Sequence, residues 1–352
     1  MWRLALLAAI GCGKQINPAW CAEPGHSDPA CADVTDAYML DAHMTDADIA
    51  SCSGDACPID PTLYASPTGG GTTCTSAAKC TLATALDQVG GDRQVIMLDP
   101  VVYPGAVAIT RSVQIIGNGA TLQAAVSGAA VTVISGITAE LDDLTITGAT
   151  DAGISCISGT LRAHHLKIHD NQIGITSGCA LTLDRSVITA NRGGALAISA
   201  GPIDIRNNFI VGNGDSMLKR SANVTIAAGV TGAFSFNTVA YNDAKKNSTS
   251  GVLCSSAALV VNGNLITNNM ENDGFGPPQV SGACDFTKSY TVAGGNDDVH
   301  WVDVSTADFH LTVNSTVALD SAAITCDGEV DIDGDPRPQN GRCDFGADER
   351  KP

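Results

Sequence analysis

The stretch "PIDIRNNFIVGN", residues 202–213, alternates apolar and polar side chains, passes through two asparagines, and ends at a third after a short apolar run. Related stretches follow as "AFSFNTVAYN" (233–242) and "VVNGNLITNN" (260–269). Alternation with a period of two predicts short strands that bury one side. The return of asparagine at fixed places predicts a corner that is repeated between such strands.

Six apolar positions align these stretches with earlier ones, at spacings of 22, 20, 22, 29 and 27 residues. They are Ile146, Ile168, Ile188, Ile210, Val239 and Ile266. An apolar residue also stands five places before each of them: Leu141, Ala163, Leu183, Ile205, Phe234 and Val261. Repeats of this length built from strands indicate a β-solenoid whose aligned apolar residues point inward.

Asparagine stands three places after most of these positions (Asn171, Asn191, Asn213, Asn242, Asn269) and two places before the last three (Asn208, Asn237, Asn264). Asparagine tolerates the left-handed backbone conformation that a tight corner requires. Coils stacked about 4.8 Å apart would also let the side-chain amides hydrogen-bond from coil to coil. We therefore interpret these residues as corner structure and not as a catalytic row.

With these repeats the chain resembles the right-handed parallel β-helix proteins of the pectin-lyase-like class, over about residues 65–300. The resemblance implies an all-β fold, but that class includes lyases, hydrolases, epimerases, adhesins and binding proteins. "ADFHL" (307–311) and "DIDGDPRPQNGRCDFGADE" (331–349) resemble the tail of exported bacterial β-helix proteins grouped as choice-of-anchor proteins. That second resemblance implies export and surface attachment.

The two ends of the solenoid are expected to be covered. A helical pattern at Leu82, Ala85 and Leu86, followed by an apolar strand at 95–98, predicts a short capping helix over the first coil. We expect the β-helix to occupy residues 64–300 and a C-terminal capping tail to occupy 301–352.

The N-terminal residues predict export. "MWRLALLAAIGC" has one arginine and an apolar run too short to span a bilayer. Its end, "AAIGC", resembles the lipobox of bacterial lipoproteins, with Cys12 as the lipidated residue; a plain secretion signal over 1–12 is the alternative. Residues 13–63 are acidic, repeat Asp-Ala at 36, 41 and 46, and predict a disordered tether behind it.

Cysteine usage agrees with an oxidising compartment. The chain has 13 cysteines, and all except Cys12 fall into pairs that are close in sequence. The predicted disulfides join 21 with 31, 52 with 57, 74 with 80, 156 with 179, 254 with 284 and 326 with 343. The formal net charge of −18 argues against nucleic acid and anionic membranes as partners. Membrane association is therefore expected only through a lipid anchor. Separately, the protein is expected to be a monomer.

Candidate chemistry lies first on the outward side of the strands. Two columns are predicted there: Glu140, Arg162, Thr182 and Asp204, and beside them Asp142, His164, Asp184 and Arg206. The columns are either a solvated ladder of ion pairs or a sugar-binding face in which Arg162 and His164 contact the ligand. Asp142 and Asp143 could share acid and base roles in glycoside hydrolysis, but neighbours on a strand face opposite sides, so one of them should lie at a corner.

The polar cluster "RAHHLKIHDN" holds three histidines on one coil. Alternation should separate His164 from His165, and a corner should separate His165 from His169, so a three-histidine metal site is not expected. His169 beside Asp170 is either an oriented general base or an exposed loop histidine.

Lys219-Arg220 is a basic pair in an acidic chain, placed where the resemblance puts a substrate groove. An anionic polysaccharide would need such cations, and an exposed strand edge is the structural alternative. Asp331, Asp333 and Asp335 have the alternate spacing of calcium loops, but Pro336 and Arg342 stand where a complete EF-hand needs glycine and glutamate. Either a partial calcium site or a salt bridge to Arg337 is expected.

Three functions are consistent with these patterns. The first is an exported, surface-anchored β-helix protein that binds extracellular polysaccharide. The second is a polysaccharide lyase or glycoside hydrolase acting on uronate-containing glycans, and the third is a structural surface protein or adhesin. They differ in whether carboxylates and a base converge in a groove.

Overall fold

The computed structural model describes residues 61–125, 127–214, 222–271, 274–275, 278–292, 298–326, 328–339 and 341–351. The chain divides at residue 60 into two units, and the described residues belong to the second, residues 61–352. The lipobox with Cys12, the acidic tether up to residue 60, Cys21, Cys31, Cys52, Cys57 and the pair Lys219-Arg220 lie outside the described residues.

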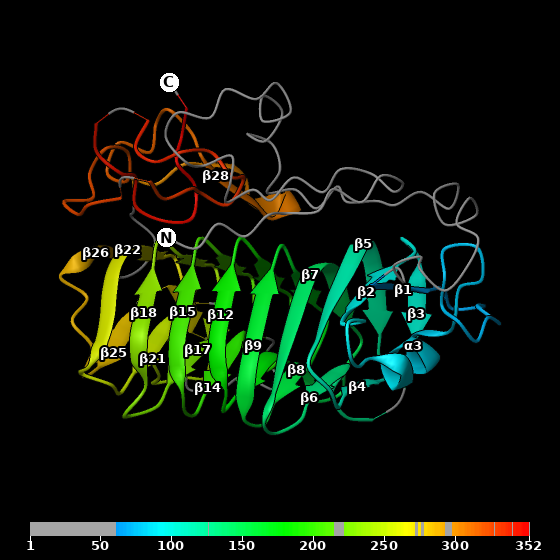
Figure 1. Cartoon of the computed structure of the whole chain (residues 1–352). Coiled ribbons are helices and arrows are strands. Elements are labelled where there is room, and N and C mark those ends of the chain that lie inside the picture. The colour runs from blue at the N-terminus through cyan, green and yellow to red at the C-terminus, as the bar shows by residue number, and fades with distance from the viewer. Residues whose placement is uncertain are drawn as a thin grey trace, which may run out of the picture. The chain divides into compact units, whose positions relative to one another are not determined.

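The described chain winds into a parallel β-helix with three faces (Figure 1). The first face consists of β2 (Val95–Leu98), β9 (Gly159–His164), β12 (Ala180–Asp184), β15 (Pro202–Arg206) and β18 (Thr231–Ser235), with the first halves of β5 (Val113–Gln123), β7 (Ile137–Thr147) and β22 (Leu259–Thr267). The second face consists of β3 (Val102–Pro104), β10 (Lys167–His169), β13 (Val187–Thr189), β16 (Phe209–Val211) and β19 (Thr238–Ala240), with the second halves of β5, β7 and β22. These two faces form one 15-stranded sheet, which also contains β1 (Thr62–Ala65) and β26 (Lys288–Val292).

The third face is an eight-stranded sheet. Its strands are β4 (Val107–Ile109), β6 (Val131–Val133), β8 (Ala152–Cys156), β11 (Ile173–Ser177), β14 (Leu196–Ile198), β17 (Val224–Ile226), β21 (Val252–Cys254) and β25 (Val280–Gly282). Short strands β20 (Asp243–Ala244), β23 (Met270–Glu271) and β24 (Gly274–Phe275) form a separate small sheet.

The aligned apolar residues are register partners from coil to coil, as predicted. Ile146 pairs with Ile168, and the series continues through Ile188, Ile210, Val239 and Ile266. All six are fully buried, and the apolar residues five places earlier are buried beside them. The predicted all-β parallel β-helix is therefore confirmed.

The structure corrects the prediction that the stacked asparagines themselves adopt the left-handed conformation at the corners. Left-handed residues do form a column at each of two corners, but the stacked asparagines are not those residues. Between the first and second faces the left-handed positions are Asn118, Asp143, His165, Arg185, Asn207, Phe236 and Gly263. Between the second and third faces they are Gly148, Asp170, Ala190, Gly212, Tyr241 and Asn268. Each stacked asparagine follows such a residue, because the left-handed residue turns the chain and the next side chain then points inward.

Two ladders of buried asparagine amides run along these corners. Each Nδ2 donates to Oδ1 of the next residue, at 3.1 Å from Asn171 to Asn191 and at 2.9 Å from Asn191 to Asn213. This ladder continues through Asn242 and Asn269 to Gln279. The other ladder joins Asn208, Asn237 and Asn264 and ends at Ser289. The predicted coil-to-coil hydrogen bonds are confirmed.

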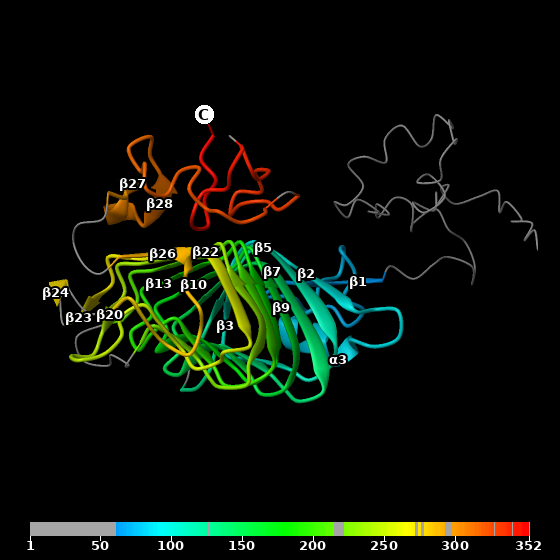
Figure 2. The same cartoon turned by 90° about the vertical axis from the view of Figure 1, so that its left-hand side faces the viewer.

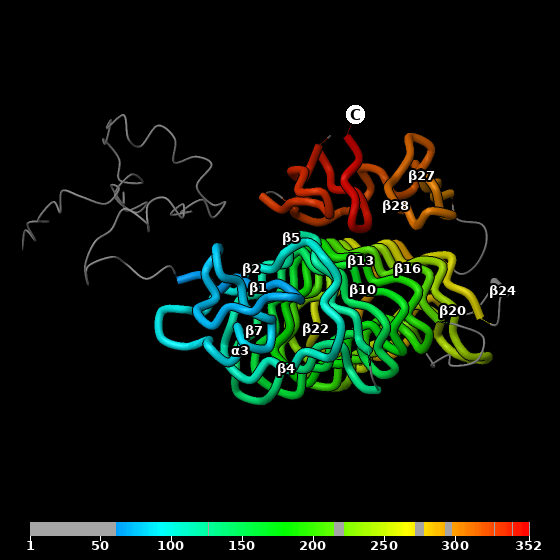
Figure 3. Tube along the Cα trace, turned by 90° about the vertical axis from the view of Figure 1, so that its right-hand side faces the viewer, coloured from blue at the N-terminus to red at the C-terminus, as the bar shows by residue number. Residues whose placement is uncertain are grey.

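The predicted capping helix is α3 (Leu82–Gln88), which lies at the end of the solenoid where β1 and β2 begin (Figure 3). Thr81 caps it by accepting a hydrogen bond from the backbone N–H of Thr84, and Leu82 and Ala85 are buried against the first coil. Four predicted disulfides are present: Cys74–Cys80, Cys156–Cys179, Cys254–Cys284 and Cys326–Cys343, with Cα separations between 4.8 and 6.2 Å.

The segment from residue 298 onward packs along the outside of the second face (Figures 1 and 2). It contains β27 (Trp301–Asp303), a short 3-10 helix (Val304–Thr306) and β28 (Asp308–Leu311), and then continues as irregular chain. Phe309 and Ala347 contact Phe209 and Ala240 of the second face, while Leu311 and Ala318 contact Leu265. The later strands of this face are therefore buried on both sides, whereas the outward residue Lys167 on β10 is exposed.

Candidate functional site

A cleft of about 450 Å³ lies where the C-terminal segment stops covering the second face. Its solenoid side carries His165, Lys167 and Arg185, and its C-terminal side carries Asp308, His310 and Asp333. Val187, Phe209 and Ile332 provide apolar surface between them. We call this feature the corner cleft, because His165 and Arg185 occupy left-handed corner positions on neighbouring coils.

The solenoid side of the corner cleft is cationic. Within the part of the chain that the structure describes, the Lys167 ammonium makes no hydrogen bond or ion pair, and the residue is exposed on β10. Arg185 donates from Nε to Asp184 Oδ2 at 2.8 Å, which holds its guanidinium beside the cleft. His165 is fixed by a hydrogen bond of 2.8 Å between Nδ1 and Asp142 Oδ1. Two permanent cations and one titratable ring thus face the same space.

The opposite side is acidic and centres on His310. Its Nδ1 lies 2.6 Å from Asp308 Oδ1, and the edge of the imidazole meets the ring of Phe209 at 5.2 Å between centroids. Burial works to lower the pKa of His310, but the hydrogen bond to Asp308 and the charges of Asp348 and Asp333 raise it overall. This side of the cleft therefore has a negative electrostatic potential.

The predicted outward columns have the predicted register. Asp142 pairs with His164 and Asp184 with both His164 and Arg206, while Arg162 lies between Glu140 and Thr182. The ion pairs do not simply follow the columns. His164 is 3.9 Å from Asp184, Glu140 accepts instead from Gln114 at 2.9 Å, and Arg206 binds Asp204 beside it and Glu329 of the C-terminal segment at 2.8 Å.

The prediction that strand alternation places His164 and His165 on opposite sides of the sheet is wrong. Both side chains are accessible from outside, because the left-handed backbone of His165 interrupts the alternation. Asp143 lies at the same corner one coil earlier, as expected for one member of the aspartate pair.

The pKa values of Asp142 and of its neighbour in the outward column, Asp184, are not those of a general acid. Burial works to raise the pKa of Asp142, but the hydrogen bond and charge of His165, with His164 and Arg185, lower it overall. Burial also works to raise the pKa of Asp184, but hydrogen bonds from His164 and Arg185 lower it overall. Glycoside hydrolysis needs one carboxyl whose pKa is raised, so these two are better suited to orienting cations than to donating protons.

His169 and Asp170 are hydrogen-bonded, with Nδ1 2.7 Å from Oδ2. They lie at the corner between the second and third faces, and neither lines the corner cleft. The carboxyl of Asp170 is 68% exposed. Asp170 therefore orients the His169 ring, but the cationic and acidic residues of the corner cleft lie elsewhere.

The C-terminal motif brings Asp331, Asp333 and Asp335 together, with one oxygen of each within 4.8 Å of the others. Asp331 Oδ1 accepts from the backbone N–H groups of Asp333 and Asp335, so the carboxylate organises the loop. Calcium at this loop stays a prediction.

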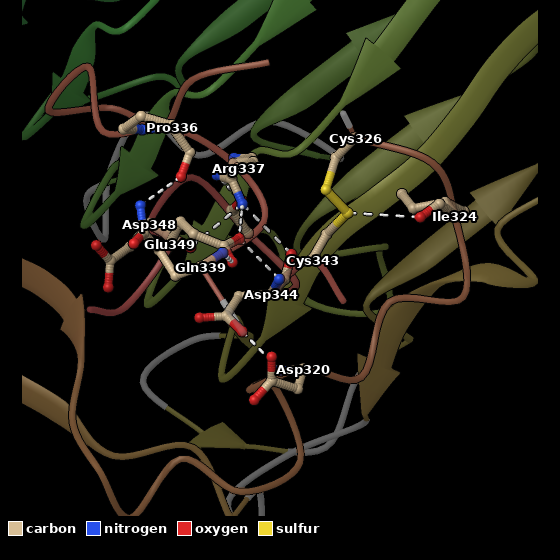
Figure 4. The surroundings of a disulfide bond; sticks show 11 residues. Asp320, Ile324, Cys326, Pro336, Arg337, Gln339, Cys343, Asp344, Asp348 and Glu349 are labelled. Atoms are coloured by element: carbon tan, nitrogen blue, oxygen red, sulfur yellow. Dashed lines mark hydrogen bonds and ion pairs between the residues drawn. A yellow bond between two sulfur atoms is a disulfide. The ribbon is translucent and has the colours of Figure 1, made fainter. Parts of the chain in front are cut away.

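Arg337 has a different partner from the expected aspartates. Its buried guanidinium pairs with Glu349 at 3.0 Å (Figure 4). The guanidinium also lies over the ring of Phe236, 4.8 Å from the ring centroid. This buried pair lies close to the Cys326–Cys343 disulfide, and together they hold the motif in shape.

No family model matches the sequence, and no curated protein matches it in sequence. Among solved structures, a pectate lyase, Pel9A, is similar, with a TM-score of 0.48 and 13% sequence identity over 84% of this chain and 98% of that one. The assignment of the fold rests on the strand pairing within this chain and not on that likeness.

Several cleft residues were missed from the sequence. Lys167 and Arg185 look like ordinary exposed positions, and His310 stands well over 100 residues further along the chain. A second basic pair, Lys245-Lys246, also escaped notice; it is exposed after β20 and away from the cleft lining. No helix in the described part of the chain has both the length and the apolar character needed to cross a membrane.

Proposed function

We propose that this chain is an exported β-helix protein that binds a uronate-containing extracellular polysaccharide in the corner cleft. The observation that carries the proposal is the pairing of Lys167 and Arg185 with an apolar surface in a chain whose formal net charge is −18. An acidic protein repels an anionic glycan at long range, so binding requires a local cationic site.

The two sides of the cleft suit different groups of such a sugar. Arginine can hold a carboxylate through two parallel hydrogen bonds, whereas lysine acts as a point charge. Asp308 and Asp333 on the other side can accept hydrogen bonds from sugar hydroxyls. Arg162 and His164 on the first face, and Lys219-Arg220, are proposed to extend contact along the chain of sugars. Export rests on the lipobox-like N-terminus and on the disulfides.

Calorimetry with oligogalacturonate tests the site. The double variant Lys167→Ala/Arg185→Ala should bind about 100-fold more weakly, because two charge-assisted contacts are lost. The free energy of unfolding should fall by about 1 to 2 kcal/mol, because the partly buried Arg185–Asp184 pair is lost while Asp184 keeps its hydrogen bond from Asn207.

The matched control is Lys245→Ala/Lys246→Ala, which removes the same charge from an exposed loop outside the cleft. Equal weakening in both variants would mean that only the overall field matters. Unchanged affinity in the cleft variant would move the site to Lys219-Arg220.

Catalysis is the second candidate, because the hydrogen-bonded pair His165–Asp142 opens on the same cleft. A lyase would release unsaturated products that absorb near 235 nm, and a hydrolase would release reducing ends. Turnover of oligogalacturonate that is lost in His165→Ala would favour the enzyme over the binding protein.

A further inference from the structure

A second cluster borders the corner cleft, built from the C-terminal segment alone. His310, Asp333 and Asp348 each place one nitrogen or oxygen within 4.8 Å of those of the other two. His310 is on β28, Asp333 is in the loop that follows Asp331, and Asp348 is near the end of the described chain. Three segments therefore bring imidazole and carboxylate groups to one point.

The imidazole is oriented as metal-binding histidines are. Nδ1 is engaged by Asp308 at 2.6 Å, which leaves Nε2 facing the other two carboxylates. A carboxylate on the far nitrogen fixes the ring and raises the basicity of the ligating nitrogen. Phe209 packs edge to face against the ring and restricts its rotation further.

The second nitrogen of His310 is buried and has no hydrogen bond from the protein. It lies 3.0 Å from Asp333 Oδ2, but the angle is not that of a hydrogen bond. A buried ring nitrogen without a partner is unfavourable, and a bound cation would satisfy it while offsetting the repulsion between Asp333 and Asp348.

We propose that His310, Asp333 and Asp348 form a binding site for a divalent transition-metal ion. One nitrogen and two carboxylate oxygens are ligands that Zn²⁺ and Mn²⁺ accept, whereas calcium sites are built from oxygen alone. Bonds of about 2.1 Å place neighbouring ligand atoms roughly 3 to 4 Å apart, so small side-chain rotations close the site. Because Asp333 and His310 line the corner cleft, an ion held by them would border it.

The remaining contacts of the cluster agree with this assignment. Asp348 is buried, and its Oδ2 accepts the backbone N–H of Leu311 at 2.7 Å, which fixes the carboxylate in place. The Asp333 side chain is 55% exposed, so an ion can enter from solvent. The ligand set differs from the calcium-type loop, with which it shares only Asp333.

Titration of the chelator-treated full chain with Zn²⁺, by calorimetry without glycan, tests the site independently of the proposed function. We expect one binding event that is lost in His310→Ala and in Asp333→Asn. Asp308→Asn should bind 10- to 100-fold more weakly, because it removes only the group that orients the imidazole. Mn²⁺ should give an electron paramagnetic resonance signal of bound ion with the same dependence on these residues.

The control is His169→Ala, which removes another histidine held by an aspartate through Nδ1 but outside the cluster. It should bind Zn²⁺ as the wild type does. Absence of Zn²⁺ binding by the wild type would overturn the proposal, and so would equal affinity in His310→Ala. Asp333→Asn keeps the test valid if His310→Ala fails to fold, since the Asp333 side chain is largely in solvent.

Discussion

At the scale of single residues, the asparagine ladders supply buried hydrogen bonds from coil to coil along two corners. Asn191 Nδ2 donates to Ile168 O at 2.9 Å, Thr189 O at 3.0 Å and Asn213 Oδ1 at 2.9 Å. Its Oδ1 accepts from both the backbone N–H and the amide of Asn171. All of these groups are buried or nearly so. If the Asn191 side chain were removed, water could not easily replace it as their hydrogen-bond partner.

Asn191→Ala should therefore reduce the free energy of unfolding by about 3 kcal/mol or more, since each unsatisfied buried group costs roughly 1 to 3 kcal/mol. Chemical denaturation monitored by circular dichroism measures this. Asn314→Ala, at an exposed position, is the control and should stay within about 0.5 kcal/mol of wild type. Similar stability of both variants would contradict a supporting role for the ladder.

A second residue-scale prediction concerns Asp344, which accepts from the backbone N–H groups of Asp320 and Arg350. Burial raises the pKa of Asp344 from its ordinary value of 3.8 to about 7. The folded state then holds this proton more tightly than the unfolded state, so stability from this group is present below about pH 4 and is lost as the pH rises to 7.

Thermal unfolding of the wild type should thus show a decline in stability between about pH 4 and pH 7 to which Asp344 contributes. Asp344→Asn should flatten this decline, at the expense of one hydrogen bond at every pH. An unchanged slope in the variant would show that other groups cause it. Asp142 and Asp184, whose pKa values are lowered, act in the opposite direction and only as the pH falls below about 4.

At the scale of elements, the strands and their register could be predicted from the sequence, but the corner cleft could not. Ile168 and Ile188 recur with the period of a coil, and every coil must bury the same column, so local patterns fixed the register. Cys156 and Cys179 could be paired because stacking brings successive coils together. The left-handed positions were missed because residues as different as Asp143 and Phe236 occupy them.

The corner cleft could not be predicted because it is formed by residues distant in sequence. Its C-terminal side reaches the solenoid through contacts such as Arg206 with Glu329, 123 residues apart, and Thr238 with Ala347, 109 residues apart. No periodicity links such positions. The aspartate loop and the histidines were recognisable as residue types, but which of them share one space depends on how the C-terminal segment lies on the second face.

At the scale of the whole described chain, the C-terminal segment is attached by a small aromatic cluster. The ring of Phe309 lies 6.3 Å from Phe209, 5.7 Å from Tyr241 and 5.3 Å from Trp301, and the residue is 2% exposed. The coils beneath are held by their own backbone pairing and by the asparagine ladders. The segment should therefore be able to detach before the solenoid unfolds.

Phe309→Ala removes the centre of this cluster and should weaken docking of the segment by about 3 to 5 kcal/mol. Limited proteolysis should then cut the segment beyond residue 298 well before the coils, and a dye that binds apolar surface should report the exposed second face. Val313→Ala, at a position 62% exposed, is the matched control and should leave the digestion pattern unchanged. If Phe309→Ala instead exposes the coils and the segment to protease at the same rate, the two form one cooperative unit, because loss of the outer layer then unfolds the second face as well.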